Sequence, residues 1–514
     1  MKRLTIIFPF LGLLLLAGCM DNFLDHKPPV QRTQDNFFQS KADAEQALFA
    51  AYEVLKFSHG RENSGFHPFD LVSNVLSDDA YGGGSGPGDQ PEILEFNEHN
   101  ISVTNSKVYG LWSDRYTGIY RTNLLLENID DVLFENEQDR AIIAAEARFL
   151  RVLFYFDLVR FFGYVPLFER PLVAEDIRMT QNDPGDVYEF LVTELVDIIP
   201  DLRAVVPPAE RGRASTWAAK SMLARIYLYH RDYAQPVLGA GPLPVTESVV
   251  LGHLEDVIND SPHQLLPEFS SLWGRAANNN NEAIFSVQHI TTSFGDWGFL
   301  NGSIGNWASQ MTGLRGVGFH PQYADGWSFQ PVTPDLAAAF DQDADARYFL
   351  SILDPVEEGV RHRADEMFQW HGFAFKKFYP RFPDFPPVNT PFNWPYNRPV
   401  VRFADVLLMA AELGSPNAQQ YFNQVRMRAY GDDFVQIPPT RENIMAERRL
   451  EFAGEGQRYW DLLRMGLDTA AQRINAQAVQ DVPINFRTER LGLLPIPQSE
   501  INLSDRTLVQ NPGY

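Results

Sequence analysis

The chain has 514 residues, of which 45% are hydrophobic and 13% aromatic, so it has enough apolar side chains to build a large core. The formal charge of −23 and the lack of any Lys/Arg cluster exclude nucleic acid as an expected partner, because binding a phosphate backbone requires a basic patch. The single cysteine, Cys19, excludes an intramolecular disulfide.

Residues 1–18 are predicted to be a lipoprotein signal peptide. A positive start at Lys2 and Arg3 precedes an apolar run from Leu4 to Ala17, which is too short to span a bilayer comfortably. The run ends in Leu16-Ala17-Gly18-Cys19, a lipobox in which the cysteine thiol receives a diacylglycerol. We therefore predict lipidation at Cys19, stable anchoring in a membrane by the acyl chains, and a tether over residues 19–34.

Helical periodicity of the apolar residues predicts a scaffold, mainly over residues 35–56, 108–235 and 400–470. Ala141 to Phe162 is apolar on nearly every face, so it is expected to be a buried central helix, and its arginines argue against a membrane span. The other helices predicted before residue 200 are Ala42–Lys56, Val108–Ile129 and Asp183–Ile199.

Two segments resemble helix pairs of the tetratricopeptide type. The first is Arg213–Tyr229, with Ser215 or Thr216 as its cap, followed by a turn over residues 230–234. The second joins Val401–Leu413 to Ala418–Tyr430. We expect the helices before residue 235 to form further pairs, so the predicted fold is mainly α, with a tetratricopeptide-like scaffold.

Residues 57–107 are predicted to be mostly loop. Seven turn-type residues follow one another from Gly82 to Gly88, which no helix or strand tolerates. Pro87 breaks the Gly-x-Ser-x-Gly pattern of a nucleophile elbow, and the loop has no lysine for a phosphate site. Two interpretations remain: a flexible surface loop, or a ligand-facing loop with Asp79 and Tyr81 at its rigid end.

Residues 235–399 are predicted to be a second loop-rich stretch, with one short strand-like run at 283–288. The stretch is rich in Gly, Pro and Asn and holds six of the nine tryptophans. A segment this long without regular structure inside a compact protein is usually functional. It lacks the spacing of a calcium loop at residues 341–352, and the histidines show no metal-binding motif, so we predict no metal and no cofactor.

Tryptophans in this stretch are candidates for stacking against sugar rings, whose flat C–H faces suit an aromatic surface. Polar residues and glycines lie between them, as the hydroxyls of a sugar would require. For any single tryptophan the alternative is packing within a loop, with its indole N–H satisfied internally. The predicted ligand-binding residues are Asp79, Tyr81, Asp296, Trp297, Trp307 and Trp327.

Ile444–Gly466 is predicted to form two helices separated by Gly454 and Gly456. Glu447 and Glu451 lie at i,i+4 spacing on one face of the first helix, and further charges alternate with the apolar residues of the second. Such dense charges among core-type residues indicate salt bridges that lock the two helices together. A catalytic Glu–Arg arrangement is the alternative.

This C-terminal stretch resembles the signature of the SusD/RagB family of surface nutrient-binding lipoproteins. The tyrosine-rich segment 116–128, the helix end at 147–167 and the tail at 493–514 resemble the family as well. The resemblance implies one SusD-like domain over residues 35–514. Its ligand site would lie in the loop-rich half made of residues 57–107 and 235–399, with part of the site on the N-terminal loop.

The resemblance further implies a lipoprotein that faces outward from the outer membrane. It would capture an oligosaccharide, or a peptide as some members do, and pass it to a SusC-like TonB-dependent transporter without catalysis. Two alternatives stay open. A surface glycoside hydrolase would need two carboxylates about 5–10 Å apart, and no local motif suggests such a pair. A tetratricopeptide adaptor that binds only protein would have no use for the aromatic loops.

Overall fold

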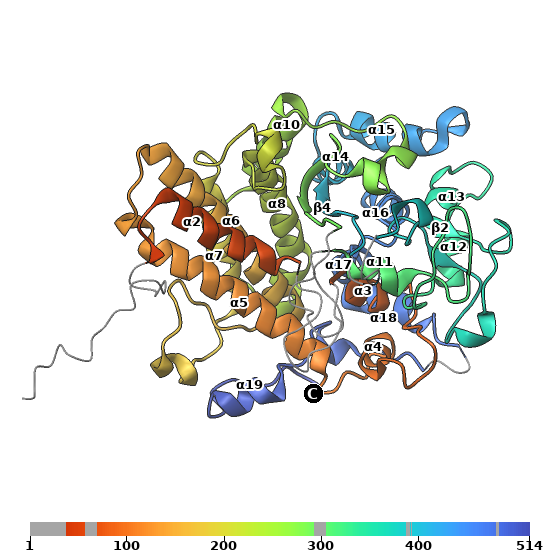
Figure 1. Ribbon diagram of the computed structural model, residues 1–514, viewed down its shortest axis with the longest axis horizontal. Coiled ribbons are helices and arrows are strands. Elements are labelled where there is room, and N and C mark those ends of the chain that lie inside the picture. The colour runs from red at the N-terminus through yellow and green to blue at the C-terminus, as the bar shows by residue number, and fades with distance from the viewer. Residues whose placement is uncertain (1–36, 57–68, 292–304, 387–390, 392, 480–482) are drawn as a thin grey trace, which may run out of the picture.

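The computed structural model describes residues 37–56, 69–291, 305–386, 391, 393–479 and 483–514. Helices in an ordered array form the scaffold, and each packs on the next along the array. Figure 1 shows its first members on the left and its last member, α15, at the upper right. In array order they are α2 (Lys41–Val54), α5 (Ser106–Asn128), α6 (Glu137–Phe162), α7 (Pro184–Ile198), α8 (Thr216–Tyr229), α10 (Glu247–Asp260), α14 (Phe403–Glu412) and α15 (Ala418–Tyr430). The structure confirms a mainly α fold built from helix pairs.

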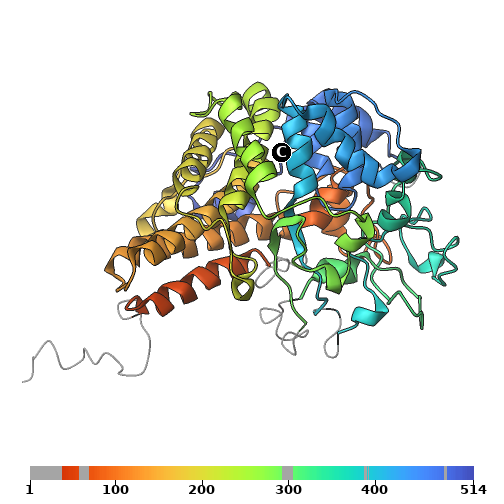
Figure 2. The same cartoon turned by 90° about the horizontal axis from the view of Figure 1, so that it is seen from above.

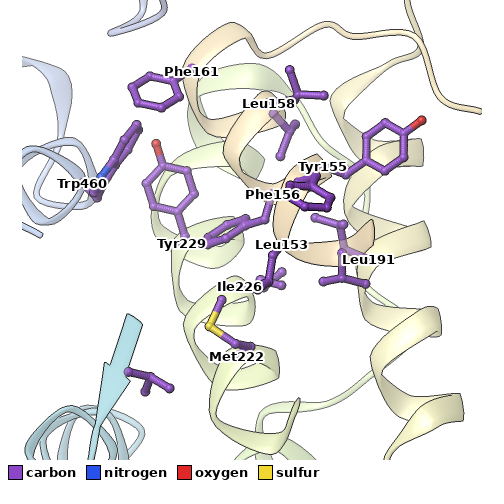
Figure 3. Close-up of a cluster of buried hydrophobic side chains, with 14 of the residues drawn as sticks. Leu153, Tyr155, Phe156, Leu158, Phe161, Leu191, Met222, Ile226, Tyr229 and Trp460 are labelled. Atoms are coloured by element: carbon purple, nitrogen blue, oxygen red, sulfur yellow. The ribbon is translucent and has the colours of Figure 1, made fainter. Parts of the chain in front are cut away.

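Helix α6 is the centre of the core, as its apolar sequence predicts. Asn136 caps its first turn by accepting a hydrogen bond from the Gln138 amide, and Gly163 ends it with a φ of 67°. Figure 3 shows side chains of α6, α7 and α8 meeting in one cluster, with Trp460 at its edge. Each large side chain buried there contributes roughly 1.5–3 kcal/mol relative to an exposed one.

The scaffold helices begin and end within a few residues of their predicted bounds, and the predicted cap of α8 is present. Ser215 is the N-cap of α8 and accepts a hydrogen bond from the Ala218 amide at 3.2 Å. A π-helical turn over His230–Ala234 and the short α9 (Gln235–Leu238) follow this helix. The late pair α14 and α15 lies where the sequence places it.

The boundary drawn at residue 235 between scaffold and loops is wrong in one respect. Helix α10 lies inside the stretch predicted to lack helices, and it packs on both α8 and α14. Val250, Leu254 and Val257 repeat at helical spacing and are buried. Residues 57–107 likewise hold two short helices, α3 (Phe69–Val75) and α4 (Pro91–Asn97), within the predicted loop.

The loop-rich half lies beside the array, on the right in Figure 1, and the two halves also lie side by side in the view of Figure 2. The strand-like run predicted at 283–288 is confirmed as β1, which pairs antiparallel with β4. A second small sheet joins β2 to β3. The elements are α11 (Trp307–Thr312), α12 (Pro334–Ala339), α13 (Arg347–Ser351), β1 (Ala283–Val287), β2 (Ile352–Leu353), β3 (Ala374–Phe375) and β4 (Arg398–Arg402).

The C-terminal helices confirm the predicted clamp. Helix α16 (Arg441–Glu451) ends before Gly454 and Gly456, both at positive φ, and α17 (Arg458–Arg464) resumes after them. The Arg448 guanidinium of α16 donates to the Asp461 carboxylate of α17 at 2.9 Å. Helices α18 (Leu467–Asn475) and α19 (Gln498–Leu503) then complete the chain.

The acidic face of α16 joins the two halves of the molecule. Glu451 is fully buried and binds Arg347 of α13 at 3.1 Å, Arg402 of β4 at 2.8 Å and Arg428 of α15 at 2.5 Å. Glu447 binds the same Arg347 at 2.5 Å. Because these groups are closed off from solvent, their arrangement is that of a structural network rather than of a catalytic site.

Gly118→Ala is expected to destabilise the protein by about 1–3 kcal/mol through overpacking. A Cβ at Gly118 of α5 would lie 2.4 Å from the Phe154 ring of α6. Gly252→Ala in α10 is the matched control, because a Cβ there meets nothing within 4 Å. The control is expected to gain up to about 1 kcal/mol from helix propensity. Urea unfolding measures the stability of the two variants. An equal gain in the free energy of unfolding in both would contradict the α5–α6 contact.

Candidate ligand-binding surface

Three segments that are far apart in the sequence form one surface of the loop-rich half. Residues 313–330 lie in the middle. They contact the glycine-rich loop through an antiparallel bridge between Gly83 and Phe329. On the other side, a bridge joins Tyr323 to Arg381. The Arg363 amide also donates to the Arg315 carbonyl at 2.9 Å. We call residues 82–89, 313–330 and 361–385 together the loop surface.

The glycine-rich loop is anchored at one end and exposed at the other. Its first three glycines are buried, and the Gly84 carbonyl accepts hydrogen bonds from the Phe368 amide at 2.8 Å and the Ser328 hydroxyl at 3.1 Å. Ser85, Pro87 and Gly88 are exposed. The loop therefore presents its polar tip from a fixed base.

Charged groups lie next to this tip. The Arg315 guanidinium donates to the Asp89 carboxylate at 2.9 Å and to the Ser328 hydroxyl at 3.0 Å. Ser85 donates to the same carboxylate at 2.8 Å. Both charged side chains keep about a quarter of their area exposed, at 23% for Arg315 and 28% for Asp89. They offer donors and acceptors to a polar ligand while holding each other in place.

Aromatic rings lie on the same surface. Trp327 and Trp370 are half-buried. Phe319, Phe382 and Phe385 are 86%, 39% and 48% exposed, with ring centroids 5.3 Å and 6.0 Å apart in succession. We call these three residues the phenylalanine row. A row of exposed rings of this kind is rare on a soluble protein unless something binds there.

Sequence reasoning missed the phenylalanine row because, among the aromatic residues, it considered only tryptophans and Tyr81. The short segment Phe382-Pro-Asp-Phe385 and the Gly318-Phe319 pair carry a weak signal, since aromatic residues beside Pro or Gly sit on turns. Their exposure depends on contacts with distant segments. For example, the Phe382 amide donates to the Gln322 carbonyl at 3.0 Å.

Three of the predicted ligand-binding residues are buried in the structure, although they were expected to face a ligand. Asp79 pairs with Arg449 at 2.8 Å, and burial raises the pKa of its carboxyl to about 6 despite that arginine. Tyr81 is 1% exposed and donates to the Gln477 carbonyl at 3.3 Å. Trp307 is also 1% exposed. These three residues support the loop surface from beneath.

Of the other predicted ligand-binding residues, the structure describes only Trp327. Trp327 is half-buried on the loop surface, and its ring lies edge-on to Trp307 at a centroid distance of 6.3 Å. Asp296 and Trp297 lie outside the described residues, as does Cys19.

In the part of the chain that the structure describes, no group of His, Cys, Asp or Glu is arranged to hold a metal ion. Within the same residues, no helix is both long and apolar enough to cross a bilayer.

Gly83→Ala is expected to cost about 1–3 kcal/mol and to loosen the base of the glycine-rich loop. Gly83 has a φ of +76°, and a Cβ there would lie 2.3 Å from the Ser328 carbonyl oxygen. Gly88→Ala at the exposed tip is the control, because its Cβ would meet nothing within 4 Å. Urea unfolding and limited proteolysis measure the two effects. Equal stability of the two variants would show that the loop is not held at Gly83.

Comparisons with known proteins agree with this architecture. A family model described as "SusD family" matches residues 355–514, and a model described as "Starch-binding associating with outer membrane" matches residues 22–228. SusD-like protein P25 of Formosa agariphila is 28% identical, over 97% of this chain and 98% of its own.

Two solved structures are similar over nearly the whole chain. A laminarin-binding SusD-like protein is 30% identical with a TM-score of 0.80, covering 93% of this chain and 100% of its own. Surface glycan-binding protein A from Bacteroides thetaiotaomicron, in complex with laminarihexaose, is 26% identical with a TM-score of 0.81. That alignment covers 92% of this chain and 100% of the other.

Proposed function

The chain belongs to the SusD/RagB family, and we propose that it captures an oligosaccharide at the cell surface and passes it to a SusC-like TonB-dependent transporter without catalysis. The observation that carries the proposal is the loop surface. Its exposed phenylalanine row lies on the same surface as the paired Arg315 and Asp89 side chains. Aromatic faces suit the C–H faces of sugar rings, and the charged pair suits their hydroxyls.

The ligand we propose is a glucan of the laminarin type. Two similar structures support this choice, because one is named for laminarin binding and the other contains laminarihexaose. The phenylalanine row, Trp327 and Trp370 would supply stacking contacts. Asp296 and Trp297 remain proposed ligand contacts on the basis of the sequence. The buried Asp79, Tyr81 and Trp307 would instead hold the loops that carry the contacts.

Outer-membrane attachment is proposed through lipid at Cys19, with the protein facing outward. The lipobox at residues 16–19 and the family description that mentions the outer membrane support this placement. Cys19→Ala removes only the acceptor thiol, so this variant is expected to lose its attachment to the membrane.

Affinity electrophoresis of the purified chain through gels that contain laminarin, starch or a β-mannan tests the proposed function. Slowed migration in laminarin, with no new reducing ends after incubation, is the expected result. New reducing ends would make the protein a glycoside hydrolase. Unchanged migration in every glycan would favour the protein-binding adaptor and overturn the proposal.

A further inference from the structure

A cavity lies on the scaffold, outside the loop surface. It has a volume of about 610 Å³ and follows one face of α5. Tyr109, Ser113, Tyr116 and Tyr120 line it at spacings that place them on one side of the helix, with Trp112 beside them. This floor extends for roughly 17 Å along the helix axis. We call the cavity the tyrosine groove.

Two short helical segments form the walls of the tyrosine groove. One wall is residues 172–179, which include a 3-10 helix (Ala174–Arg178), and the other is α19 with the residues after it. Arg178 pairs with Asp505 at 3.0 Å, and the Val509 amide donates to the Gln181 side chain at 2.8 Å. Because the walls are tied to each other, the groove exists before any partner arrives. Figure 1 labels α5, which forms the floor, and α19, which belongs to one wall.

Apolar side chains surround the mouth of the groove. Val173, Ile177 and Leu503 are 52%, 45% and 57% exposed, and Tyr120 is 39% exposed. A single exposed apolar residue is ordinary, but four around one cavity are typical of a place where a protein binds something. The mostly aliphatic rim distinguishes this groove from the loop surface, where the large exposed apolar side chains are phenylalanines.

One carboxylate in the wall lacks a cationic partner. Glu500 is half-buried, and no Lys or Arg of the described chain lies within salt-bridge distance of it. Burial raises the pKa of its carboxyl, and the nearby Trp112 side chain only partly offsets this rise. The other charged groups that line the groove are already paired, Asp176 with Arg170 at 2.6 Å and Arg121 with Glu53 at 3.2 Å. A cation from outside would therefore find Glu500 unpaired.

We propose that the tyrosine groove binds an extended peptide segment of a partner protein, with apolar side chains on the tyrosine floor and a Lys or Arg beside Glu500. A floor of roughly 17 Å fits about five residues of extended chain. The hydroxyls of Tyr109 and Tyr120, which hydrogen-bond to none of the described residues, can donate to backbone carbonyls of the segment. Aromatic-lined grooves are a recurring binding site for extended peptide segments.

Charge supports a basic segment over an acidic one. The chain carries a formal charge of −23, and Glu500 is the unpaired ionisable group in the wall. An unlike charge next to a half-buried carboxylate forms a charge-assisted hydrogen bond, whereas a like charge would be repelled. The proposal is independent of the proposed function, since no residue of the groove belongs to the loop surface.

Panning a random dodecapeptide library on phage against the full chain tests the proposal. The enriched peptides, labelled with fluorescein, are then titrated against the wild type, Glu500→Lys and Leu503→Asp by fluorescence anisotropy. Val249→Asp on α10 is the matched control, because Val249 is 47% exposed and lies outside the groove. Both test substitutions change side chains at the mouth or wall, so circular dichroism and urea unfolding are expected to match the control.

The expected result is enrichment of peptides that combine apolar residues with Lys or Arg. Their affinity is expected to fall at least tenfold in Glu500→Lys and in Leu503→Asp, to remain unchanged in Val249→Asp, and to weaken with added salt. Laminarin retention should stay the same in all four proteins, which separates this proposal from the proposed function. A library without enrichment, or enriched peptides that bind both test variants as well as the wild type, would overturn the proposal.

Discussion

Glu451→Gln is expected to destabilise the folded protein by about 3–5 kcal/mol, because it leaves buried guanidinium groups without their counter-charge. Glu451 is fully buried and binds Arg347, Arg402 and Arg428. Glu442→Gln on the same helix is the matched control, since Glu442 is exposed, and its expected effect is below about 1 kcal/mol. Urea unfolding at pH 7 measures both variants.

The same network predicts how stability depends on pH. Burial alone would raise the pKa of Glu451, but the charges of Arg428, Arg402 and Arg347 outweigh burial and hold the pKa at about 2. A folded pKa below the unfolded value of 4.5 gives stabilisation that is present above pH 4.5 and lost as the pH falls toward 2. The difference in stability between wild type and Glu451→Gln should therefore shrink over this range. A constant difference would contradict the network.

Replacing the phenylalanine row by alanine, with Phe319, Phe382 and Phe385 changed together, is expected to weaken laminarin binding by about 2–3 kcal/mol. This corresponds to roughly a 30- to 150-fold loss of affinity. The three rings are exposed, so their removal takes away stacking surface with little effect on folding. Titration calorimetry with a laminarin oligosaccharide measures the loss, and urea unfolding confirms that the fold is retained.

Phe349→Ala is the matched control for the phenylalanine row. Phe349 lies in the loop-rich half, on α13, and is 45% exposed, but it stands outside the row. It is expected to keep the affinity of the wild type. If the triple variant and the control bound laminarin equally well, the ligand would have to contact other parts of the protein, with Trp327 and Trp370 as the next residues to replace.

The sequence predicts the scaffold well because local rules govern it. The apolar run of α6, the cap at Ser215 and the glycines at 454 and 456 each act within a few residues. Helix α10 escaped prediction because turn residues at 239–244 and 261–262 flank its short apolar pattern and gave the whole region the composition of a loop.

The candidate site could not be predicted residue by residue, since long-range contacts decide which side chains are exposed. Asp79 is buried by Arg449, which lies 370 residues further along the chain. Ser328 and Gly84, whose hydrogen bond fixes the glycine-rich loop, are 244 residues apart. Composition drew attention to the aromatic, glycine-rich loops, but it could not distinguish the buried Trp307 from the exposed Phe319.

Hydrogen–deuterium exchange of the full chain, with and without a saturating laminarin oligosaccharide, tests the central claim most directly. Ligand capture at the loop surface predicts slower amide exchange in residues 82–89, 313–330 and 361–385, with no change along α5 and α19. Protection confined to the helices of the scaffold, or no protection at saturation, would contradict the assignment of the loop surface as the place where the ligand binds.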